Sequence, residues 1–366
     1  MRELIQVSDE PLALLGALRN ALGGGPAIAP VRNLQERLYP NTVDSNVAIV
    51  IQTSGSTAEP KQVALSAAAA TASARASAER LGGTGQWLLA VPTSYVAGIN
   101  VLVRSICANT EPVVIRDGFS EGAFFEAAKQ MNGDAKFTSL VPNQLSRLLE
   151  KATKDELHLL SRFDRILIGG QRLQTQALDK ALEAGLKISR TYGSTETFGG
   201  CVYDGEPLPG VQVRTRLGAV EISGPTLAEG YLENPALTNE KFVLDDGTRW
   251  YRTDDLGEIV DGKLRIAGRS DDVIISGGIK VSAAAIEQVV RSIPGVTGAV
   301  VFGVEDEHWG QVPIAFIEGV NIGLGELREL VGAQLGPAAR PARLTRLETI
   351  PRLSNGKPNL IALRNR

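Results

Sequence analysis

The sequence predicts an α/β protein of two domains, a large N-terminal domain and a small C-terminal one. The chain has 366 residues, more than one ordinary domain needs. Between residues 47 and 203, short apolar runs alternate with helical patterns, which is typical of a mainly parallel sheet. After Tyr203, strand-like runs are separated by Gly and Asp turns, and this indicates a small β subdomain. From Arg269 onward, strands and helices form a smaller α+β unit.

Apolar periodicity and helix propensity define the elements of the N-terminal half. Residues 11–22 predict a helix, residues 23–30 a break, and a second short helix follows before residue 45. The buried-strand run at 47–51 leads into a polar loop, and the alanine-rich stretch 65–80 predicts a helix. Later strands are expected at 87–91, 112–115, 137–141, 165–168 and 186–189, with helices at 123–131, 143–151 and 175–184 between them.

The C-terminal half is punctuated by turns. Short strands are expected at 211–213, 219–223, 257–260 and 263–266. The last unit should contain helices at 283–293 and 325–335 and strands at 299–304 and 312–317. We therefore place the domain boundary near residues 269–272, with one domain at 1–268 and the other at 269–366.

Composition excludes several classes of function. The net charge is −3 and the pI is near 5.7, so there is no basic excess for nucleic acid. Cys107 and Cys201 are too few for a disulfide framework or a Cys-based zinc site, and His158 and His308 leave little room for a His-ligated metal. The N-terminus lacks the order of a signal peptide, and no apolar run is long enough to insert into a membrane. We expect a cytoplasmic protein.

The polar loop after the strand at 47–51 has the inventory of a phosphate site. Phosphate binding needs backbone amides, hydroxyls and a lysine that converge at a strand-to-helix junction without crowding Cβ atoms. The candidate residues are Thr53, Ser54, Gly55, Ser56, Thr57 and Lys61. The spacing is not that of a Walker A motif, and a polar turn that caps the alanine-rich helix would explain the same residues.

A competing signal is the G-x-S-x-G pattern at Gly118–Gly122, which fits the nucleophile elbow of a hydrolase. A triad would need an acid and a histidine downstream of Ser120. An ordinary helix start explains the pattern better, because Ser120 is a good N-cap and Glu121 is favourable in the first turn.

Five motifs in order resemble the adenylate-forming superfamily of acyl-CoA synthetases, peptide-synthetase adenylation domains and luciferases. The phosphate loop resembles T-[SG]-G-[ST]-[ST]-G-x-P-K, with Ala58 in place of the usual glycine. Residues 250–256 resemble W-[YF]-x-T-G-D-[LI], with Asp254 in the glycine position. The other three are Tyr192–Glu196 (Y-G-x-T-E), 268–278 (G-R-x-[DK]-[DE]-x-I-x-x-G-G) and Asn355-Gly356-Lys357 (N-G-K). The resemblance runs from about Val47 to the end and implies that the C-terminal domain is mobile.

Two further segments resemble short actinobacterial-type o-succinylbenzoate–CoA ligases, enzymes of menaquinone biosynthesis. Residues 92–105 resemble the acyl-pocket segment of that group, which often carries histidine where Ser94 and Tyr95 stand here. Residues 197–208 follow the Y-G-x-T-E motif as they do there. The implied reaction is 2-succinylbenzoate + ATP + CoA giving 2-succinylbenzoyl-CoA, AMP and pyrophosphate.

The resemblance implies roles for individual residues. Catalysis is expected from Lys357, which would bridge the carboxylate and the α-phosphate, from Thr195 at the α-phosphate, and from Glu196, which would bind Mg²⁺. ATP or AMP would be held by Thr53, Ser54, Gly55, Ser56, Thr57, Lys61, Gly169, Gly170, Gln171, Tyr192, Gly193, Asp255 and Arg269. The acyl substrate would meet Tyr95, Gly98, Arg104 and Ser194, CoA would meet Gly277 and Gly278, and Asp271 would be the domain hinge.

Alternatives stay open at this level. Glu196 could cap a helix, Asp255 could be a turn residue, Lys357 could be solvated in the tail, and Arg104 could pair structurally. The nearest alternative function is another aryl- or acyl-CoA ligase with the same chemistry. A different class is a degraded nucleotide-binding protein, given Ala58 and Asp254. The expected partners are small-molecule substrates, and a homodimer is compatible with the sequence.

Overall fold

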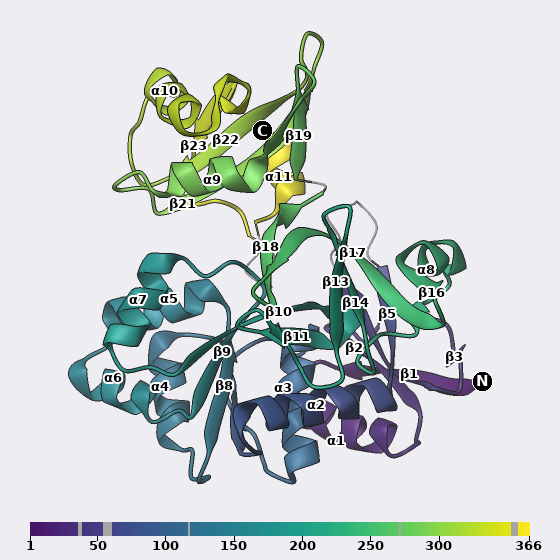
Figure 1. Cartoon of the computed structure of the whole chain (residues 1–366). Coiled ribbons are helices and arrows are strands. Elements are labelled where there is room, and N and C mark those ends of the chain that lie inside the picture. Colours follow the sequence, from purple (N-terminus) through teal and green to yellow (C-terminus); the bar gives the residue numbers. More distant parts are fainter. Residues whose placement is uncertain (36–38, 54–60, 116–117, 271, 353–357) are drawn as a thin grey trace. The chain divides into compact units, whose positions relative to one another are not determined.

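The computed structural model describes residues 1–35, 39–53, 61–115, 118–270, 272–352 and 358–366. The chain divides into two compact units (Figure 1). Unit 1 is Met1–Arg214, Glu221–Arg252 and Val260–Leu264, and unit 2 is Thr215–Val220, Thr253–Ile259 and Arg265–Arg366. Within the described residues, no helix is both long and apolar enough to cross a membrane. The domain limits expected from the sequence stay a prediction.

The first sheet of unit 1 has the strand order β15-β5-β4-β2-β1-β3. Its strands are β1 (Arg2–Ser8), β2 (Ala27–Val31), β3 (Thr42–Val43), β4 (Val47–Thr53), β5 (Lys61–Ser66) and β15 (Gly230–Tyr231). Strands β1, β2 and β4 run parallel, whereas β3, β5 and β15 pair antiparallel with their neighbours. All five residues of β2 are buried, as expected for a parallel strand covered on both faces.

The N-terminal region is partly different from its expectation. Helix α1 (Pro11–Leu22) is confirmed, and the Glu10 side chain accepts a hydrogen bond from the Ala13 amide at its start. The segments on either side are strands β1 and β2, and the described residues between 31 and 45 contain no second helix. The Arg2 guanidinium anchors β1 by donating to the backbone carbonyls of Ala21, Gly25 and Val47. This tertiary pairing is not visible in local periodicity.

The junction after the candidate phosphate loop also differs. The sequence predicts a helix at 65–80 directly after the loop, but β5 comes first and pairs antiparallel with β4, with Thr53 opposite Lys61. The residues on either side of the loop, Thr53 and Lys61, therefore belong to paired strands, and no helix follows the loop directly. Helix α2 (Ala67–Leu81) begins after β5, where the Ser66 hydroxyl accepts from the Ala69 amide at 3.2 Å. A left-handed Gly82 ends the helix.

The second sheet has the order β12-β11-β10-β9-β8-β6-β7, and its central neighbours from β7 to β10 are parallel. The strands are β6 (Gln86–Leu89), β7 (Val113–Val114), β8 (Lys136–Leu140), β9 (Arg165–Ile168), β10 (Ile188–Ser194), β11 (Gly199–Tyr203) and β12 (Glu206–Pro207). The helices are α3 (Val96–Ala108), α4 (Glu121–Lys129), α5 (Pro142–Lys151), α6 (Lys154–Ser161) and α7 (Thr175–Glu183). The alternation predicted from the sequence is confirmed here.

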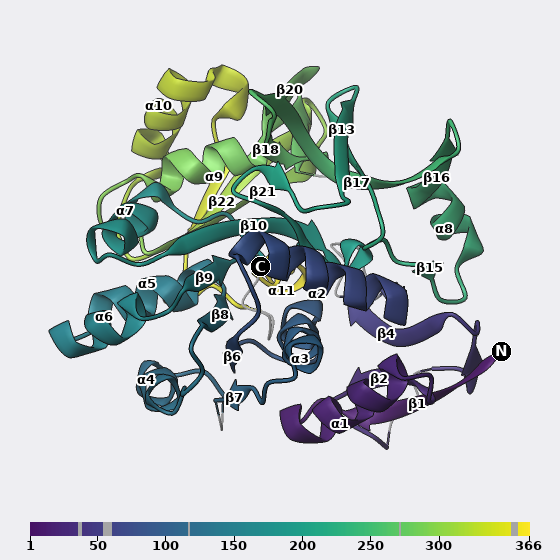
Figure 2. The same ribbon diagram turned by 60° about the horizontal axis from the view of Figure 1, so that its bottom comes forward.

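Helices α2 and α3 lie side by side, as Figure 2 shows. Helix α2 contacts β4 and β5 of the first sheet and β11 of the second, while α3 packs against β6, β8 and β11. The two helices thus fill the space between the sheets.

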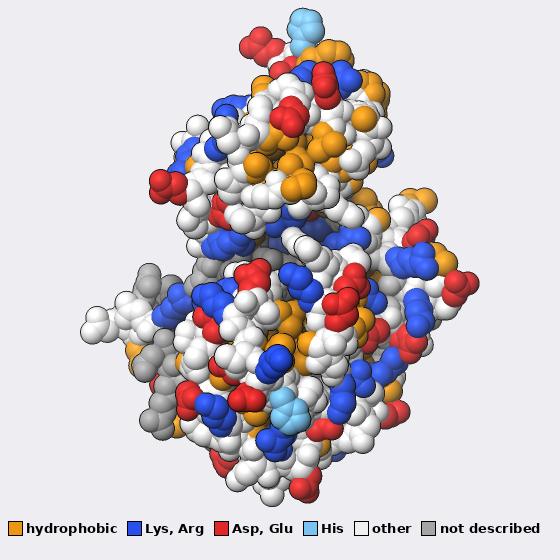
Figure 3. Space-filling view, turned by 90° about the vertical axis from the view of Figure 1, so that its left-hand side faces the viewer, with side chains coloured by type: hydrophobic (Ala, Val, Ile, Leu, Met, Phe, Trp, Pro, Cys, Tyr) orange, Lys and Arg blue, Asp and Glu red, His pale blue; other side chains and the backbone are white. Residues whose placement is uncertain are grey.

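The surface of unit 1 carries charges of both signs. On the face drawn in Figure 3, acidic and basic side chains are interspersed over this unit.

The third sheet is the predicted antiparallel β subdomain, and its strands belong partly to each unit. It has the order β13-β14-β17-β16, with β18 on β17. The strands are β13 (Gln212–Arg216), β14 (Ala219–Ser223), β16 (Phe242–Asp245), β17 (Thr248–Val260) and β18 (Lys263–Arg269), and α8 (Pro235–Lys241) precedes β16. Asp261 and Gly262 connect β17 to β18 with positive φ angles of 52° and 74°, which suits a tight hairpin.

The fourth sheet forms the body of unit 2. Its order is β20-β19-β22-β21, with β23 beside β22. The elements are β19 (Val273–Ser276), β20 (Ile279–Ser282), α9 (Ala283–Arg291), β21 (Gly298–Asp306), β22 (Gly310–Glu318), α10 (Leu324–Leu335), β23 (Arg343–Arg346) and α11 (Leu360–Arg364). Side chains of β21 alternate between two cores: Ala299 and Val301 pack with α9 and α10, and Val300 and Phe302 pack with Leu363 of α11.

Candidate active site

Six predicted site residues lie outside the described residues. They are Ser54, Gly55, Ser56, Thr57, Asp271 and Lys357. The residues on either side of the candidate phosphate loop are described: Thr53 is the last residue of β4, and Lys61 is the first residue of β5. The Thr53 hydroxyl donates to the Lys61 carbonyl at 3.3 Å. The ends of the candidate phosphate loop are therefore held together by a strand pair.

The predicted adenine slot lies on neighbouring parallel strands. Gly169, Gly170 and Gln171 directly follow β9, and Tyr192 lies near the end of β10, which pairs with β9. A Cβ on Gly169 would lie 2.5 Å from the Thr191 hydroxyl oxygen, so the Thr191 side chain would have to move to admit any larger residue. The carboxyl ends of parallel strands are where ligands bind in open α/β sheets.

Gly193 allows a second close approach one residue further along β10. The pairing register between β10 and β11 shifts at Tyr192/Gly193, and a Cβ on Gly193 would lie 2.0 Å from the Gly199 carbonyl oxygen. The bulge redirects the chain at the end of β10, and after Ser194, the last residue of the strand, Thr195 and Glu196 leave the sheet in a short turn.

That turn, η1 (Thr195–Thr197), carries two predicted catalytic residues, Thr195 and Glu196. The Ser194 amide donates to the Thr197 hydroxyl at 2.9 Å and closes the turn. The backbone carbonyl of the following residue, Phe198, accepts from the Asn100 side-chain amide at 2.6 Å and from the Ser73 hydroxyl at 3.3 Å. The turn is therefore fastened to α2 and α3.

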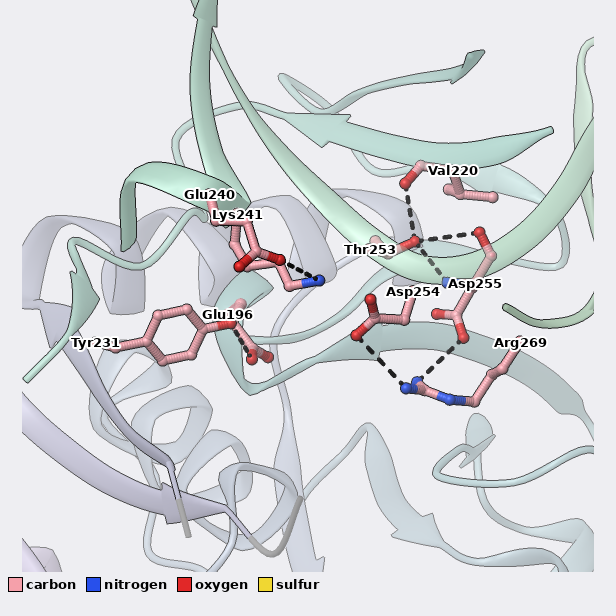
Figure 4. A network of polar contacts seen from close by, with 9 residues as sticks. All are labelled: Glu196, Val220, Tyr231, Glu240, Lys241, Thr253, Asp254, Asp255 and Arg269. Atoms are coloured by element: carbon pink, nitrogen blue, oxygen red, sulfur yellow. Dashed lines mark hydrogen bonds and ion pairs between the residues drawn. The ribbon is translucent and has the colours of Figure 1, made fainter. Parts of the chain in front are cut away.

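Glu196 is buried, with 7% of its surface exposed. Its Oε1 accepts a hydrogen bond of 2.8 Å from the Tyr231 hydroxyl (Figure 4). Burial raises the pKa of nearby Tyr251 well above its usual value, and the Glu196 carboxylate raises it further. Tyr251 thus stays protonated beside the acid. A buried carboxylate with few donors is a site that attracts a cation.

The predicted acyl segment begins α3. Tyr95 is the residue before the helix, and Gly98 is buried in its first turn, where a Cβ would lie 2.4 Å from the Pro92 carbonyl oxygen. Arg104 lies further along the same helix and is only 6% exposed. Position 98 therefore requires glycine for packing, whatever its contact with substrate.

The environment of Arg104 is aromatic and hydroxylic. Arg104 Nη2 donates to the Tyr203 hydroxyl at 3.0 Å, and that hydroxyl lies 3.0 Å from the Ser77 hydroxyl. The Arg104 guanidinium lies 4.7 Å from the centroid of the Trp87 ring. Among the described residues, no carboxylate pairs with it and its buried Nε has no hydrogen-bond partner. Arg104 also lines a cavity of about 190 Å³ with Arg75 and Cys107, whose lining contains no acidic residue.

In unit 2, the predicted ribose-binding residues lie together. Arg269 Nη1 is 3.4 Å from Asp255 Oδ1, and Arg269 Nη2 is 3.6 Å from Asp254 Oδ2 (Figure 4). The Asp255 amide donates to the Thr253 hydroxyl, which itself donates to the Val220 carbonyl at 2.8 Å. The part of β17 that carries the two aspartates is thus anchored to β14.

The predicted CoA residues, Gly277 and Gly278, form the turn between β19 and β20 with φ angles of 57° and 80°. The Gly277 amide donates to the Trp309 carbonyl at 2.8 Å, and a Cβ on Gly277 would lie 2.7 Å from the Trp309 ring.

Ser120 of the competing G-x-S-x-G pattern is exposed, and its hydroxyl accepts from the Ala123 amide at the start of α4. This is the helix start expected from the sequence.

Three residues around the site were not found by sequence reasoning. Tyr231 contacts Glu196, Asn100 holds the turn after Glu196, and Tyr203 contacts Arg104. Asn100 and Tyr203 lie inside segments that resemble the family, and for Asn100 a polar residue within an apolar helix is an available signal. Tyr231 lies on a two-residue strand, and the sequence contains no signal that connects it to Glu196.

Comparison with known proteins places these features in a family. The family profile described as "AMP-binding enzyme" matches residues 25–226, and that described as "AMP-binding enzyme C-terminal domain" matches residues 285–357. A protein named probable 2-succinylbenzoate–CoA ligase from Mycobacterium tuberculosis (strain H37Rv) is 40% identical, covering 96% of this chain and 94% of the relative. The 2-succinylbenzoate–CoA ligase of Lactococcus lactis is 30% identical, covering 86% of this chain and 70% of the relative.

Solved structures agree. The o-succinylbenzoate–CoA synthetase of Bacillus subtilis in complex with AMP superimposes with a TM-score of 0.75 at 28% identity, covering 87% of this chain and 68% of that one. MatB of Rhodopseudomonas palustris bound to ATP has a TM-score of 0.78 at 22% identity, covering 91% and 70%, and shows the shared fold alone. The chain belongs to the AMP-binding enzyme family, the adenylate-forming enzymes whose members the sequence motifs resemble.

Proposed function

We propose that this protein is a 2-succinylbenzoate–CoA ligase of menaquinone biosynthesis. In the first half-reaction, a carboxylate oxygen of 2-succinylbenzoate attacks the α-phosphorus of ATP and pyrophosphate leaves. In the second, the CoA thiol sulfur attacks the acyl carbonyl, loses its proton, and AMP leaves. The products are 2-succinylbenzoyl-CoA, AMP and pyrophosphate. The 40% identical relative over 96% of the chain supports the reaction class.

The observation that carries the choice of acid is the buried, unpaired charge of Arg104. A guanidinium that is 6% exposed and pairs with no carboxylate of the described residues has lost water without gaining an anion. The substrate has a second carboxylate that the reaction does not use. A planar arginine fork suits such a group, and the cavity beside Arg104 has no acidic residue to oppose it.

The ATP side of the proposal is supported by the glycines that follow β9 and by Tyr192 near the end of the neighbouring strand β10. Backbone at Gly169 and Gly170 would accommodate the flat adenine, with Tyr192 on the next strand. Asp255 would accept both ribose hydroxyl donors, with Arg269 in support. Thr195 and Lys357 would act at the α-phosphate, and the phosphate loop up to Lys61 would hold the β- and γ-phosphates.

Magnesium fits the unit 1 part of this site. Mg²⁺ prefers hard oxygen ligands and is usually held by one or two carboxylates together with substrate phosphates. Glu196 supplies such a carboxylate, buried and fixed by Tyr231. When bound with ATP, the ion would neutralise charge on the phosphates. Glu196 would hold it, and Thr195 on the same turn would contact the α-phosphate.

The two half-reactions need different reagents at one carbonyl, so the proposal includes a mobile C-terminal domain. Residues 269–366 would pivot about Asp271, with Lys357 present for adenylation and the Gly277–Gly278 turn near CoA for thioester formation. Hinges are a few boundary residues that absorb such a change. Since ATP and CoA are cytoplasmic metabolites, we place the enzyme in the cytoplasm, and a homodimer is its proposed assembly.

An ATP–pyrophosphate exchange assay across a panel of carboxylic acids tests the function. We expect exchange with 2-succinylbenzoate to exceed that with benzoate or simple fatty acids by at least about tenfold, and mass spectrometry to detect 2-succinylbenzoyl-CoA once CoA is added. Preference for another acid would mean a different acyl-CoA ligase. Absence of exchange with every acid would indicate a non-catalytic nucleotide-binding protein.

A further inference from the structure

The hydrogen bond between Tyr231 and Glu196 joins segments that are far apart in the sequence. Tyr231 Oη donates to Glu196 Oε1 at 2.8 Å, and the two residues are 6% and 7% exposed (Figure 4). Hydrogen bonds to an ionised acceptor are stronger than neutral ones. This bond therefore restricts the rotation of the Glu196 carboxylate. It occupies Oε1, and Oε2 is the second oxygen of the carboxylate.

The Tyr231 hydroxyl is itself rigidly placed. The backbone of Tyr231 pairs with Val63 of β5, and its amide donates to the Thr238 hydroxyl at 2.9 Å. Its ring packs against Phe242 with 5.9 Å between centroids, and Phe242 packs against Tyr251 at 5.1 Å. A tyrosine held on its backbone and ring can fix the position of a group that it contacts.

The same tyrosine also contacts the strand that leaves the phosphate loop. Lys61 begins β5, and its Nζ lies 5.8 Å from the centroid of the Tyr231 ring, within the range of a cation–π contact. One side chain thus touches Lys61 with its ring and Glu196 with its hydroxyl. These are the two residues of unit 1 that would neutralise ATP phosphates, directly or through Mg²⁺.

We propose that Tyr231 is a positioning residue that fixes the Glu196 carboxylate for metal–ATP and sets its distance from Lys61. This inference rests on the proposed function, in which Glu196 holds Mg²⁺. Residues that hydrogen-bond a ligating group orient it, and their loss typically weakens metal affinity about 10- to 100-fold. Tyr231 acts through Glu196 and does not itself touch substrate.

The test is Tyr231→Phe, which removes the hydroxyl and keeps the ring near Lys61. Mn²⁺ is titrated into the enzyme saturated with a non-hydrolysable ATP analogue, and free Mn²⁺ is measured by electron paramagnetic resonance. We expect the metal dissociation constant to rise about tenfold. Affinity for AMP without metal, measured by calorimetry, should stay within about twofold. An equal loss for AMP and Mn²⁺ would show general disruption and overturn the proposal.

Tyr39→Phe is the matched control. Tyr39 is 6% exposed, and its hydroxyl has no hydrogen-bond partner among the described residues. Removing an unpaired buried hydroxyl is close to neutral, so metal affinity should equal that of the wild type. A loss as large as that of Tyr231→Phe would mean that any buried tyrosine change disturbs the site, which contradicts a specific role.

Glu196→Gln separates this inference from the function on which it rests. If Glu196 holds the metal, this variant weakens Mn²⁺ binding, and Tyr231→Phe added to it causes no further loss, because the two act as one unit. Normal Mn²⁺ affinity in Glu196→Gln would refute the metal role and this inference with it. Weak binding in Glu196→Gln with normal binding in Tyr231→Phe would refute the positioning role alone.

Discussion

Asp254 approaches one end of the Arg269 guanidinium, with 3.6 Å between Oδ2 and Nη2. The other end faces Asp255, at 3.4 Å between Nη1 and Oδ1. Asp254 stands where the resembling family has glycine. In this protein the proposed ribose-binding carboxylate therefore shares its arginine with a second carboxylate.

Replacing Asp254 by glycine should tighten nucleotide binding. The change removes a negative charge next to the proposed ribose site and removes one of the two carboxylates that Arg269 contacts. We expect the KM for ATP to fall about two- to fivefold, on the scale of a partly exposed charge pair worth up to about 1 kcal/mol. Asp254→Asn is the control that keeps the side-chain shape, and it should give most of the effect. A rise in KM for both variants would show that Asp254 supports binding.

Arg104→Ala should impair use of 2-succinylbenzoate more than use of a monocarboxylic analogue. Leaving a buried substrate carboxylate without a charged partner costs about 2–3 kcal/mol, so kcat/KM for 2-succinylbenzoate should fall at least about thirtyfold beyond the loss for the analogue. Arg75→Ala changes an exposed arginine of the same cavity and should have little effect. Identical losses for the two acids in Arg104→Ala would make Arg104 structural.

Lys357→Ala should separate the two half-reactions. Loss of one transition-state donor lowers a rate by about a hundredfold or more, and we expect this for formation of the acyl-adenylate. Thioester formation from supplied acyl-adenylate and CoA should fall far less, because the α-phosphate bond is already made. Rapid-quench measurement of each step provides the comparison. Equal damage to both steps would contradict the assigned role.

Glu121 should stabilise the fold in a pH-dependent way. Its hydrogen bond with Arg147, aided by the helix backbone and Lys151, lowers the pKa of Glu121 from 4.5 to about 2. A lowered pKa means that the contribution is complete above about pH 4.5 and is lost as the pH falls towards 2. Glu121→Gln should cost at most about 1 kcal/mol at pH 7, since both basic partners are well exposed. Urea denaturation should show a smaller difference at pH 3, and an unchanged difference would refute this origin.

The alternation of strands and helices was predictable because buried strands such as β9 are short apolar runs between turn residues. The strand β5 was not, because Ala64 and Leu65 run into an alanine-rich helix and their helix propensity dominates a local interpretation. Pairing with β4 overrides that propensity. Strand β1 was missed for a similar reason, since its stability comes from the parallel partner β2 and from Arg2.

The site was predictable where a motif is contiguous. Tyr192 to Glu196 lie at the end of β10 and in the turn that follows it, so residues that are neighbours in the sequence are also neighbours in the structure. Tyr231 was not predictable, because its contact with Glu196 depends on how β15 is added to the edge of the first sheet. The same holds for Tyr203 and Arg104, which meet only because β11 and α3 pack together.

The attachment of the Glu196 turn to α3 bears on attempts to change the substrate range. Asn100 and Arg104 are four residues apart and so share one face of α3, yet Asn100 holds the carbonyl after the turn while Arg104 lies at the proposed acyl end. Libraries that randomise this helix to accept new acids would also loosen the ATP-binding turn. An engineering effort should keep Asn100 and Ser73 fixed and vary Arg104 together with Tyr203.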